Sequence, residues 1–192
     1  AFRAQQSSPF MLHGVTGSGK TEVYIEAARE VLAAGRGVLV IVPEIALTPQ
    51  LIDRFRARLG NQLAVLPSGL HPRVRWDGWR ALLEGRSLIG IGARSAVFAP
   101  IHNLGLIIVD EEHESSSKQQ EGLRYHARDL ALVRGMMSKC PVVLGSATPS
   151  LETFLHASRG RYGHLTLTTR PGSSVQPLIR VVDLNRVKPW EM

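Results

Sequence analysis

The sequence predicts an α/β fold in which a mainly parallel sheet carries helices on both faces. Short apolar runs of strand length alternate with longer segments whose apolar residues recur at helical spacing. The run at 38–42 is continuous and rich in β-branched residues, which is typical of a strand covered on both faces. Ligands of such sheets bind beyond the carboxyl ends of the strands. The residues that follow each strand are therefore the first candidates for a site.

The expected elements alternate in order along the chain. Strands are predicted at 10–12, 38–42, 63–66, 88–91, 106–109 and 142–144. Helices are predicted at 21–34, 48–59, 72–84 and 127–137, and a last one begins near residue 150. We expect Gly35 to close the first helix, and Thr48 and Pro49 to open the second as N-cap and first helical residue. After residue 170, proline and glycine interrupt the pattern and leave one expected strand at 178–182.

Length and composition indicate one globular domain, or one lobe of a larger protein. The chain has 192 residues, of which 44% are hydrophobic. No stretch approaches the ~18 uncharged apolar residues of a membrane span, and the first residues lack a secretory signal. The lone Cys140 can form no internal disulfide, which fits a reducing cytosol. We expect an N-terminal extension at 1–9, at the edge of an excised segment, a lobe at 10–170 and a connecting segment at 171–192.

The charge of the chain favours a polyanionic partner without proving one. The net charge is +7 and the pI is near 10.3. A basic surface with no specific partner would give the same values. The arginines are scattered rather than gathered in one tail, which suits a folded face better than a disordered arm.

Residues 14–21 read Gly-Val-Thr-Gly-Ser-Gly-Lys-Thr and stand between a predicted strand and a predicted helix. This pattern is typical of a phosphate-binding loop, whereas an ordinary glycine-rich turn needs neither the Lys-Thr pair nor the helix. Glycines let backbone N–H groups approach a polyphosphate, and the helix dipole favours the anion. Lys20 would bind the β and γ phosphates, and Thr21 would bind Mg²⁺. The candidate nucleotide-binding residues are Gly14, Thr16, Gly17, Ser18, Gly19, Lys20 and Thr21.

The predicted strand at 106–109 ends in Asp110-Glu111-Glu112-His113, 90 positions after Lys20. A solvated acidic turn is one interpretation. In a phosphate-loop enzyme, however, this is where a metal carboxylate is needed. Asp110 would then hold Mg²⁺, directly or through water, and Glu111 would orient and deprotonate the attacking water. The two motifs together favour nucleoside triphosphate hydrolysis over simple nucleotide binding.

The segment Gly-Ser-Ala-Thr-Pro at 145–149 follows the last predicted strand. Its hydroxyl groups could hydrogen-bond the acidic cluster, or they could simply cap the next helix. His113 could couple Ser146 or Thr148 to the γ-phosphate end of the site, or it could be an ordinary surface residue. These alternatives stay open at the level of the residues.

With these motifs in place, the chain resembles a superfamily 2 helicase, and more closely the first motor lobe of the bacterial replication restart helicase family. The resemblance covers roughly residues 10–185 and implies a RecA-like P-loop NTPase lobe. It rests on segments 14–24, 42–50 (Val-Pro-Glu-Ile-Ala-Leu-Thr-Pro-Gln), 92–100 (Gly-Ala-Arg-Ser-Ala-Val-Phe-Ala-Pro), 110–116, 118–129 (beginning Lys-Gln-Gln-Glu-Gly) and 145–150. The segments at 42–50 and 118–129 are far more particular to the family than the phosphate loop is.

The resemblance also implies contacts with DNA. Thr48, Arg94 and Ser95 would be donors to the backbone of a single strand. Residues 115–126 resemble the family's aromatic-rich loop, which couples strand binding to hydrolysis; there Arg124 and Tyr125 are the candidates. Ser146 and Thr148 belong to the same coupling set. The chain departs from the family pattern at Pro67, Ser117 and Leu123, and the last two leave Tyr125 as the remaining stacking platform.

The activity that the resemblance implies is ATP- and Mg²⁺-dependent 3′-to-5′ DNA unwinding in fork restart and primosome assembly, in the bacterial cytoplasm. The implied partners are DNA forks, single-stranded DNA, other primosome proteins and single-strand binding protein. A second motor lobe and a zinc-binding region would belong to other parts of the full-length protein, so the isolated lobe is expected to be poorly active. The alternatives are another superfamily 2 translocase, either a restriction motor or an RNA helicase, and a non-motor P-loop protein, either a kinase or an ATP-binding regulator.

Overall fold

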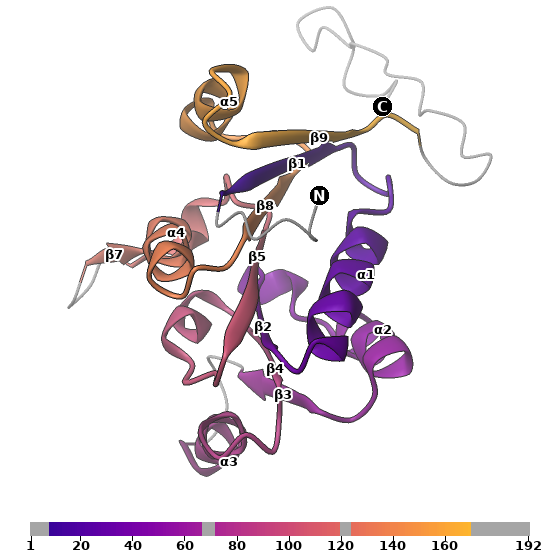
Figure 1. Ribbon diagram of the computed structural model, residues 1–192, viewed down its shortest axis with the longest axis vertical. Helices are drawn as coiled ribbons and strands as arrows, with labels where there is room; N and C mark the ends of the chain where they lie inside the picture. Colours follow the sequence, from indigo (N-terminus) through magenta and orange to yellow (C-terminus); the bar gives the residue numbers. More distant parts are fainter. Residues whose placement is uncertain (1–7, 67–71, 120–123, 170–192) are drawn as a thin grey trace, which may run out of the picture.

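The computed structural model describes residues 8–66, 72–119 and 124–169, and its centre is a seven-stranded sheet (Figure 1). The strand order is β3-β4-β2-β5-β8-β1-β9, and every pair is parallel. The strands are β1 (Phe10–Gly14), β2 (Gly37–Ile41), β3 (Leu63–Leu66), β4 (Ile89–Gly92), β5 (Leu104–Asp110), β8 (Val142–Ser146) and β9 (Gly163–Leu167). The predicted parallel sheet is confirmed.

Helices cover both faces of this sheet, as predicted. They are α1 (Lys20–Ala33), α2 (Pro49–Leu59), α3 (Pro72–Leu83), α4 (Ala127–Met137) and α5 (Leu151–Ser158), with short 3₁₀ helices η1 (Glu44–Ala46), η2 (Arg94–Phe98) and η3 (Ser115–Ser117). In Figure 1, α1 and α2 lie on one side of the sheet, and α3 and α4 lie on the other. The described residues contain no helix long and apolar enough to cross a membrane.

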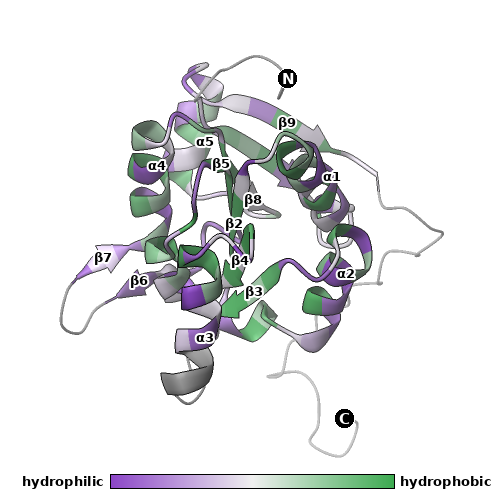
Figure 2. Cartoon of the chain, turned by 60° about the horizontal axis from the view of Figure 1, so that its bottom comes forward, coloured by the Kyte–Doolittle hydropathy of each residue, from purple (hydrophilic) through white to green (hydrophobic). Residues whose placement is uncertain are grey.

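The apolar strands form because side chains from each one are buried on both faces. In β2, Val38 and Val40 pack in the cluster that contains α1, whereas Leu39 and Ile41 pack in the cluster on the opposite face. This two-sided burial explains the continuous apolar run at 38–42. Figure 2 shows these strands as the hydrophobic centre of the molecule, with more hydrophilic residues towards its edges.

Local signals set the helix boundaries as expected. Thr48 caps α2 by accepting a hydrogen bond from the Leu51 N–H at 3.3 Å, and Pro49 is the first helical residue. Gly35 follows α1 with a left-handed φ of 69°. Ser150 caps α5 by accepting from the Thr153 N–H.

Apart from the short 3₁₀ helices, two features of the described residues were not predicted. The edge strand β9 alternates exposed and partly buried residues, so Leu165 and Leu167 reach the core while their neighbours face solvent. The second is an antiparallel hairpin of β6 (Lys118–Gln119) and β7 (Tyr125–His126), which projects from the lobe (Figure 1). The strand predicted at 178–182 and the departures at Pro67 and Leu123 lie outside the described residues.

Candidate nucleotide site

The loop between β1 and α1 has the backbone that anion binding requires. Gly17 and Gly19 have left-handed φ values of 78° and 93°, which residues with a Cβ rarely adopt. Gly19 is also the N-cap of α1 and provides no side-chain cap. The first N–H groups of a 14-residue helix are therefore left for an anion, at the positive end of the helix dipole.

Lys20 is the first residue of α1, and it is held inside the site. Its side chain is only 8% exposed, its Nζ donates to the Gly14 carbonyl at 2.9 Å, and it lies 3.7 Å from Glu111 Oε1. The Ser18 hydroxyl is also buried, and it finds no hydrogen-bond partner among the described residues. An unsatisfied buried hydroxyl next to a buried ammonium fits a site shaped for a polyphosphate. Thr21 is half-buried in the same helical turn.

Sheet order brings the separate motifs to one edge. β8 lies between β5 and β1, with Asp110 opposite Gly145, and Ser146 opposite His13. The carboxyl ends of β1, β5 and β8 therefore meet, although they are far apart in the sequence. The phosphate loop, the acidic segment at 110–113 and the segment at 145–148 become neighbours.

Asp110 ends β5 facing the site. Tyr24 donates its hydroxyl to Asp110 Oδ1 at 2.8 Å. Burial raises the pKa of Asp110, and the hydrogen bond from Tyr24 opposes that rise. The pKa of Tyr24 is raised well above its ordinary value, chiefly by burial and then by the nearby Asp110 charge, so its hydroxyl remains a donor.

Glu111 lies between a lysine and a histidine. Its φ of 44° is left-handed, a conformation that is strained for this residue type and is common at functional sites. One carboxylate oxygen is 3.7 Å from Lys20 Nζ, and the other is 3.6 Å from His113 Nδ1. Its side chain is one-third exposed, so a water molecule can reach it.

His113 joins the acidic segment to the segment at 145–148. Its Nδ1 lies 2.8 Å from Ser146 Oγ, and its Nε2 lies 3.3 Å from Thr148 Oγ1. The Thr148 N–H donates to Ser146 Oγ at 2.9 Å. The hydroxyl residues therefore meet the acidic segment through His113, and the cap of α5 is Ser150 instead.

Glu112 was not singled out in the sequence, yet it is fully buried. Its carboxylate accepts hydrogen bonds from the Ser150 N–H at 2.7 Å and from Thr153 Oγ1 at 3.0 Å, and Arg128 Nη1 lies 3.2 Å away. The residue next to Glu111 thus connects β5 to the starts of α4 and α5.

The predicted DNA-contacting residues lie at the same edge, beyond β2 and β4. The Thr48 hydroxyl acts as a helix cap, and Ser95 is partly buried in η2. Arg94 Nη1 donates to the carbonyls of Ser116 and Lys118, at 3.2 and 2.9 Å. Arg94 therefore ties η2 to the base of the hairpin.

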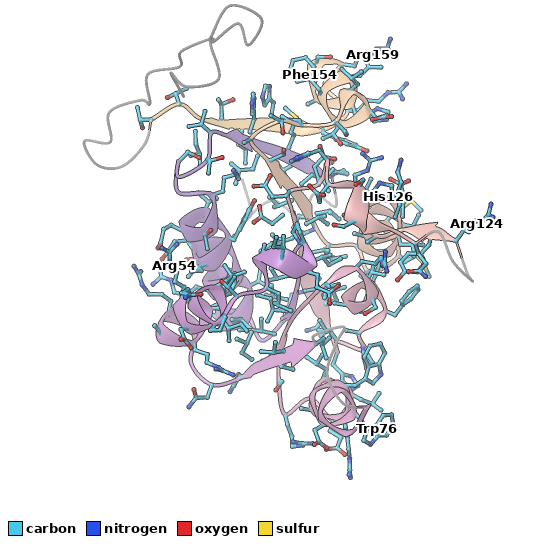
Figure 3. The ribbon with its side chains drawn as sticks, turned by 180° about the vertical axis from the view of Figure 1, so that it is seen from behind. Arg54, Trp76, Arg124, His126, Phe154 and Arg159 are labelled. Carbon is cyan, nitrogen blue, oxygen red and sulfur yellow. The ribbon has the colours of Figure 1, made fainter. Side chains whose placement is uncertain are left out.

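The hairpin carries the remaining two candidates. The Tyr125 ring packs edge-on against Phe98, an exposed aromatic residue that the sequence interpretation missed, with ring centroids 5.1 Å apart and an interplanar angle of 74°. Arg124 is exposed on the projecting hairpin, away from the body of the lobe (Figure 3). A hollow of about 560 Å³ is lined by Lys118, Gln119, Arg124, Tyr125 and His126.

Comparison with known proteins places this geometry in a family. The model of the DEAD/DEAH box helicase family matches residues 3–155. The chain is 51% identical to the replication restart protein PriA of Bacillus subtilis over 175 residues, which are 91% of this chain and 22% of that protein. It is 49% identical to PriA of Haemophilus influenzae, over 91% of this chain and 24% of that protein. The chain thus spans about a quarter or less of these relatives.

Solved structures share the fold at low sequence identity. RecG bound to a three-way DNA junction superposes with a TM-score of 0.56 at 23% identity, covering 85% of this chain and 21% of that one. A DEAD box protein from Methanococcus jannaschii gives 0.57 at 18% identity, covering 83% of this chain and 45% of that one. The fold is therefore that of a RecA-like helicase lobe.

Proposed function

Because this chain belongs to the DEAD/DEAH box helicase family, as a superfamily 2 motor lobe matching part of PriA, we propose that it drives ATP-dependent, 3′-to-5′ DNA unwinding in replication restart. The full-length protein would carry out this reaction, because the chain covers 22% of its Bacillus subtilis relative. The isolated lobe would hydrolyse little ATP, since a helicase motor closes its site with a second lobe.

One observation carries the proposal. Lys20, Asp110 and Glu111 come from two elements distant in sequence and converge at one edge of the sheet. Lys20 Nζ is 3.7 Å from Glu111, and Tyr24, one helical turn after Lys20, bonds Asp110 at 2.8 Å. A cation, a metal carboxylate and a base carboxylate beside an open helix N-terminus are the parts that phosphoryl transfer to water needs.

The donor set fits Mg²⁺ with a nucleoside triphosphate. Mg²⁺ keeps several waters and phosphate oxygens as ligands. The Thr21 hydroxyl and the Asp110 carboxylate would therefore be sufficient as protein ligands. Bound there, the metal would neutralise negative charge on the phosphates. Gly14, Thr16, Gly17, Ser18 and Gly19 would provide the loop that surrounds them.

Each side chain then has a task. Lys20 would exchange its bond with the Gly14 carbonyl for a phosphate oxygen, while Glu111 would orient the attacking water and accept its proton. His113 would couple the γ-phosphate end of the site to the segment at 145–148, since it contacts both Ser146 and Thr148. The chain at 145–148 would thereby sense whether the γ phosphate is present.

DNA would lie along the same edge of the sheet. Thr48, Arg94 and Ser95 follow β2 and β4, and Arg124 and Tyr125 extend the surface onto the hairpin. The net charge of +7 supports a polyanionic partner. By similarity to the PriA proteins, forks and single strands would be the substrates, with primosome proteins and single-strand binding protein as partners.

The experiment compares Glu111→Gln with the wild type in the full-length protein. The amide keeps the shape of the carboxylate but cannot accept a proton, so hydrolysis should fall by at least ~100-fold, the usual size of a general-base contribution. Binding of ATP should persist, because Lys20 and the loop are intact. ATPase rates and equilibrium binding of a fluorescent ATP analogue give the two readouts.

Three outcomes would point elsewhere. A variant that hydrolyses ATP at the wild-type rate would remove Glu111 from the chemistry. A wild-type protein that binds ATP but hydrolyses none, with or without forked DNA, would favour a regulator. An ATPase stimulated by RNA and not by forked DNA would favour the RNA-helicase alternative.

A further inference from the structure

Tyr24 has a buried hydroxyl aimed into the nucleotide site. The residue is 2% exposed, and its ring belongs to the core between α1 and the sheet. Its Oη donates to Asp110 Oδ1 at 2.8 Å, across 86 positions of sequence. A core role alone would be filled equally well by phenylalanine, so the hydroxyl needs a separate explanation.

The position of Tyr24 on α1 links it to the phosphate loop. It follows Lys20 by four residues and Thr21 by three, spacings that put side chains on one face of a helix. The same helix therefore presents a phosphate ligand, a metal-binding hydroxyl and a donor to the metal carboxylate. Moving α1 against β5 would move all three groups together.

Gly145 makes this contact possible. It lies in β8 directly opposite Asp110 and has no left-handed φ, so no turn requires a glycine there. A Cβ at this position would stand 1.6 Å from Tyr24 Oη and 2.8 Å from the ring Cζ. No real contact is that short. The Tyr24 hydroxyl therefore occupies the space that a side chain at position 145 would need.

We propose that Tyr24 is a positioning residue for Asp110, and that Gly145 is glycine in order to admit it. The hydroxyl engages Oδ1 and fixes the plane of the carboxylate that would bind a metal or a metal-bound water. Hydrogen bonds to a ligating carboxylate orient it in this way in metal sites generally. The inference rests on the proposed function, since it concerns how that site holds Mg²⁺.

The test measures how nucleotide binding depends on Mg²⁺ in the full-length protein. A fluorescent ADP is titrated at a series of Mg²⁺ concentrations, and again with the metal chelated. Tyr24→Phe should raise the Mg²⁺ concentration for half-maximal binding by ~10-fold or more, the usual effect of losing such a partner. Binding without metal should not change, because the loop and Lys20 are untouched. A merely structural tyrosine would leave the Mg²⁺ dependence at the wild-type value.

Tyr162→Phe is the matched control. Tyr162 is partly buried, packs against the His156 ring at a tilt, and lies against the core cluster on the face of the sheet opposite α1. This variant loses a hydroxyl of the same kind and should keep the wild-type Mg²⁺ dependence. Were it to shift as much as Tyr24→Phe, the positioning role would be overturned.

A second pair of variants tests the fit of Gly145 without any ligand. Gly145→Ala should lower the melting temperature, because its methyl group collides with the Tyr24 hydroxyl. The double variant Gly145→Ala/Tyr24→Phe loses the closest clash and should melt at a higher temperature than Gly145→Ala alone. Equal melting temperatures for the single and double variants would overturn the role assigned to Gly145.

The failure of this inference can be told from the failure of the proposed function. If the wild type binds ADP more tightly with Mg²⁺ and Tyr24→Phe does the same, Tyr24 does not position Asp110. If the wild type gains nothing from Mg²⁺, the proposed nucleotide site itself is wrong.

Discussion

At the scale of single residues, the site is held by buried polar groups that are satisfied from several elements. Glu112 shows this best, because it is fully buried and follows Glu111 directly. It receives hydrogen bonds from Ser150, the N-cap of α5, and from Thr153 on that helix, and it pairs with Arg128 on α4. A buried carboxylate is tolerated only when such partners are present. Glu112 therefore fixes the turn that aims Glu111.

We predict that Glu112→Ala destabilises the fold by about 3 kcal/mol or more, because it removes the acceptor of the Ser150 N–H and the Thr153 hydroxyl and the buried carboxylate that pairs with Arg128. Urea-induced unfolding measures the change.

Asp129→Ala is the matched control. Asp129 also pairs with Arg128, at 2.9 Å, but its side chain is 59% exposed. Surface pairs contribute little, so this variant should unfold close to the wild type. Equal effects of the two substitutions would show that burial does not decide the importance of Glu112.

At the scale of elements, the hairpin β6–β7 contacts η2 and leads through α4 to the acidic segment of the nucleotide site. Arg94 ties its first strand to η2, and Tyr125 packs on Phe98 of η2. Its second strand runs directly into α4, where Arg128 reaches Glu112 beside the catalytic candidates. A DNA strand that shifted the hairpin would therefore displace the turn at 110–113 through α4 and Arg128.

The hairpin is where the coupling to DNA can be tested. We predict that Tyr125→Ala in the full-length protein lowers DNA-stimulated ATP hydrolysis and leaves basal hydrolysis unchanged. The lost stacking contact corresponds to ~1–3 kcal/mol per base. Steady-state ATPase assays with and without single-stranded DNA give both rates.

Trp76→Ala serves as the control for this experiment. Trp76 is an aromatic residue on α3, 58% exposed and remote from the hairpin (Figure 3). It should change neither rate. An equal loss of basal and stimulated hydrolysis in Tyr125→Ala would contradict a coupling role for Tyr125.

At the scale of the whole molecule, the sequence predicts the layered fold because its signals are local and strong. The apolar run at 38–42 and the caps at Thr48 and Ser150 need no distant partner to be understood. β9 was not predicted because it is a half-buried edge strand. Its apolar residues alternate with polar ones and form no continuous apolar run. The strands of the hairpin are two residues each, too short for any periodicity.

The candidate site also has a part that local sequence predicts and a part that it does not. The phosphate loop and the segment at 110–113 are legible as motifs, and the sheet brings them together. The link between Tyr24, Asp110 and Gly145 depends on β8 lying beside β5, which no local pattern reveals. The network around Glu112 likewise joins residues up to 41 positions apart. Gly145 was expected just after the strand at 142–144, whereas it lies inside β8.

The central claim is that Lys20, Asp110 and Glu111 surround one metal–triphosphate. It is tested most directly by crystals of the full-length protein grown with a non-hydrolysable ATP analogue and Mn²⁺ in place of Mg²⁺. We predict one anomalous peak between Thr21 and Asp110, with the phosphates over the first turn of α1 and the γ phosphate near Lys20. Phosphates bound away from that turn, or a Mn²⁺ peak distant from both side chains, would contradict the account.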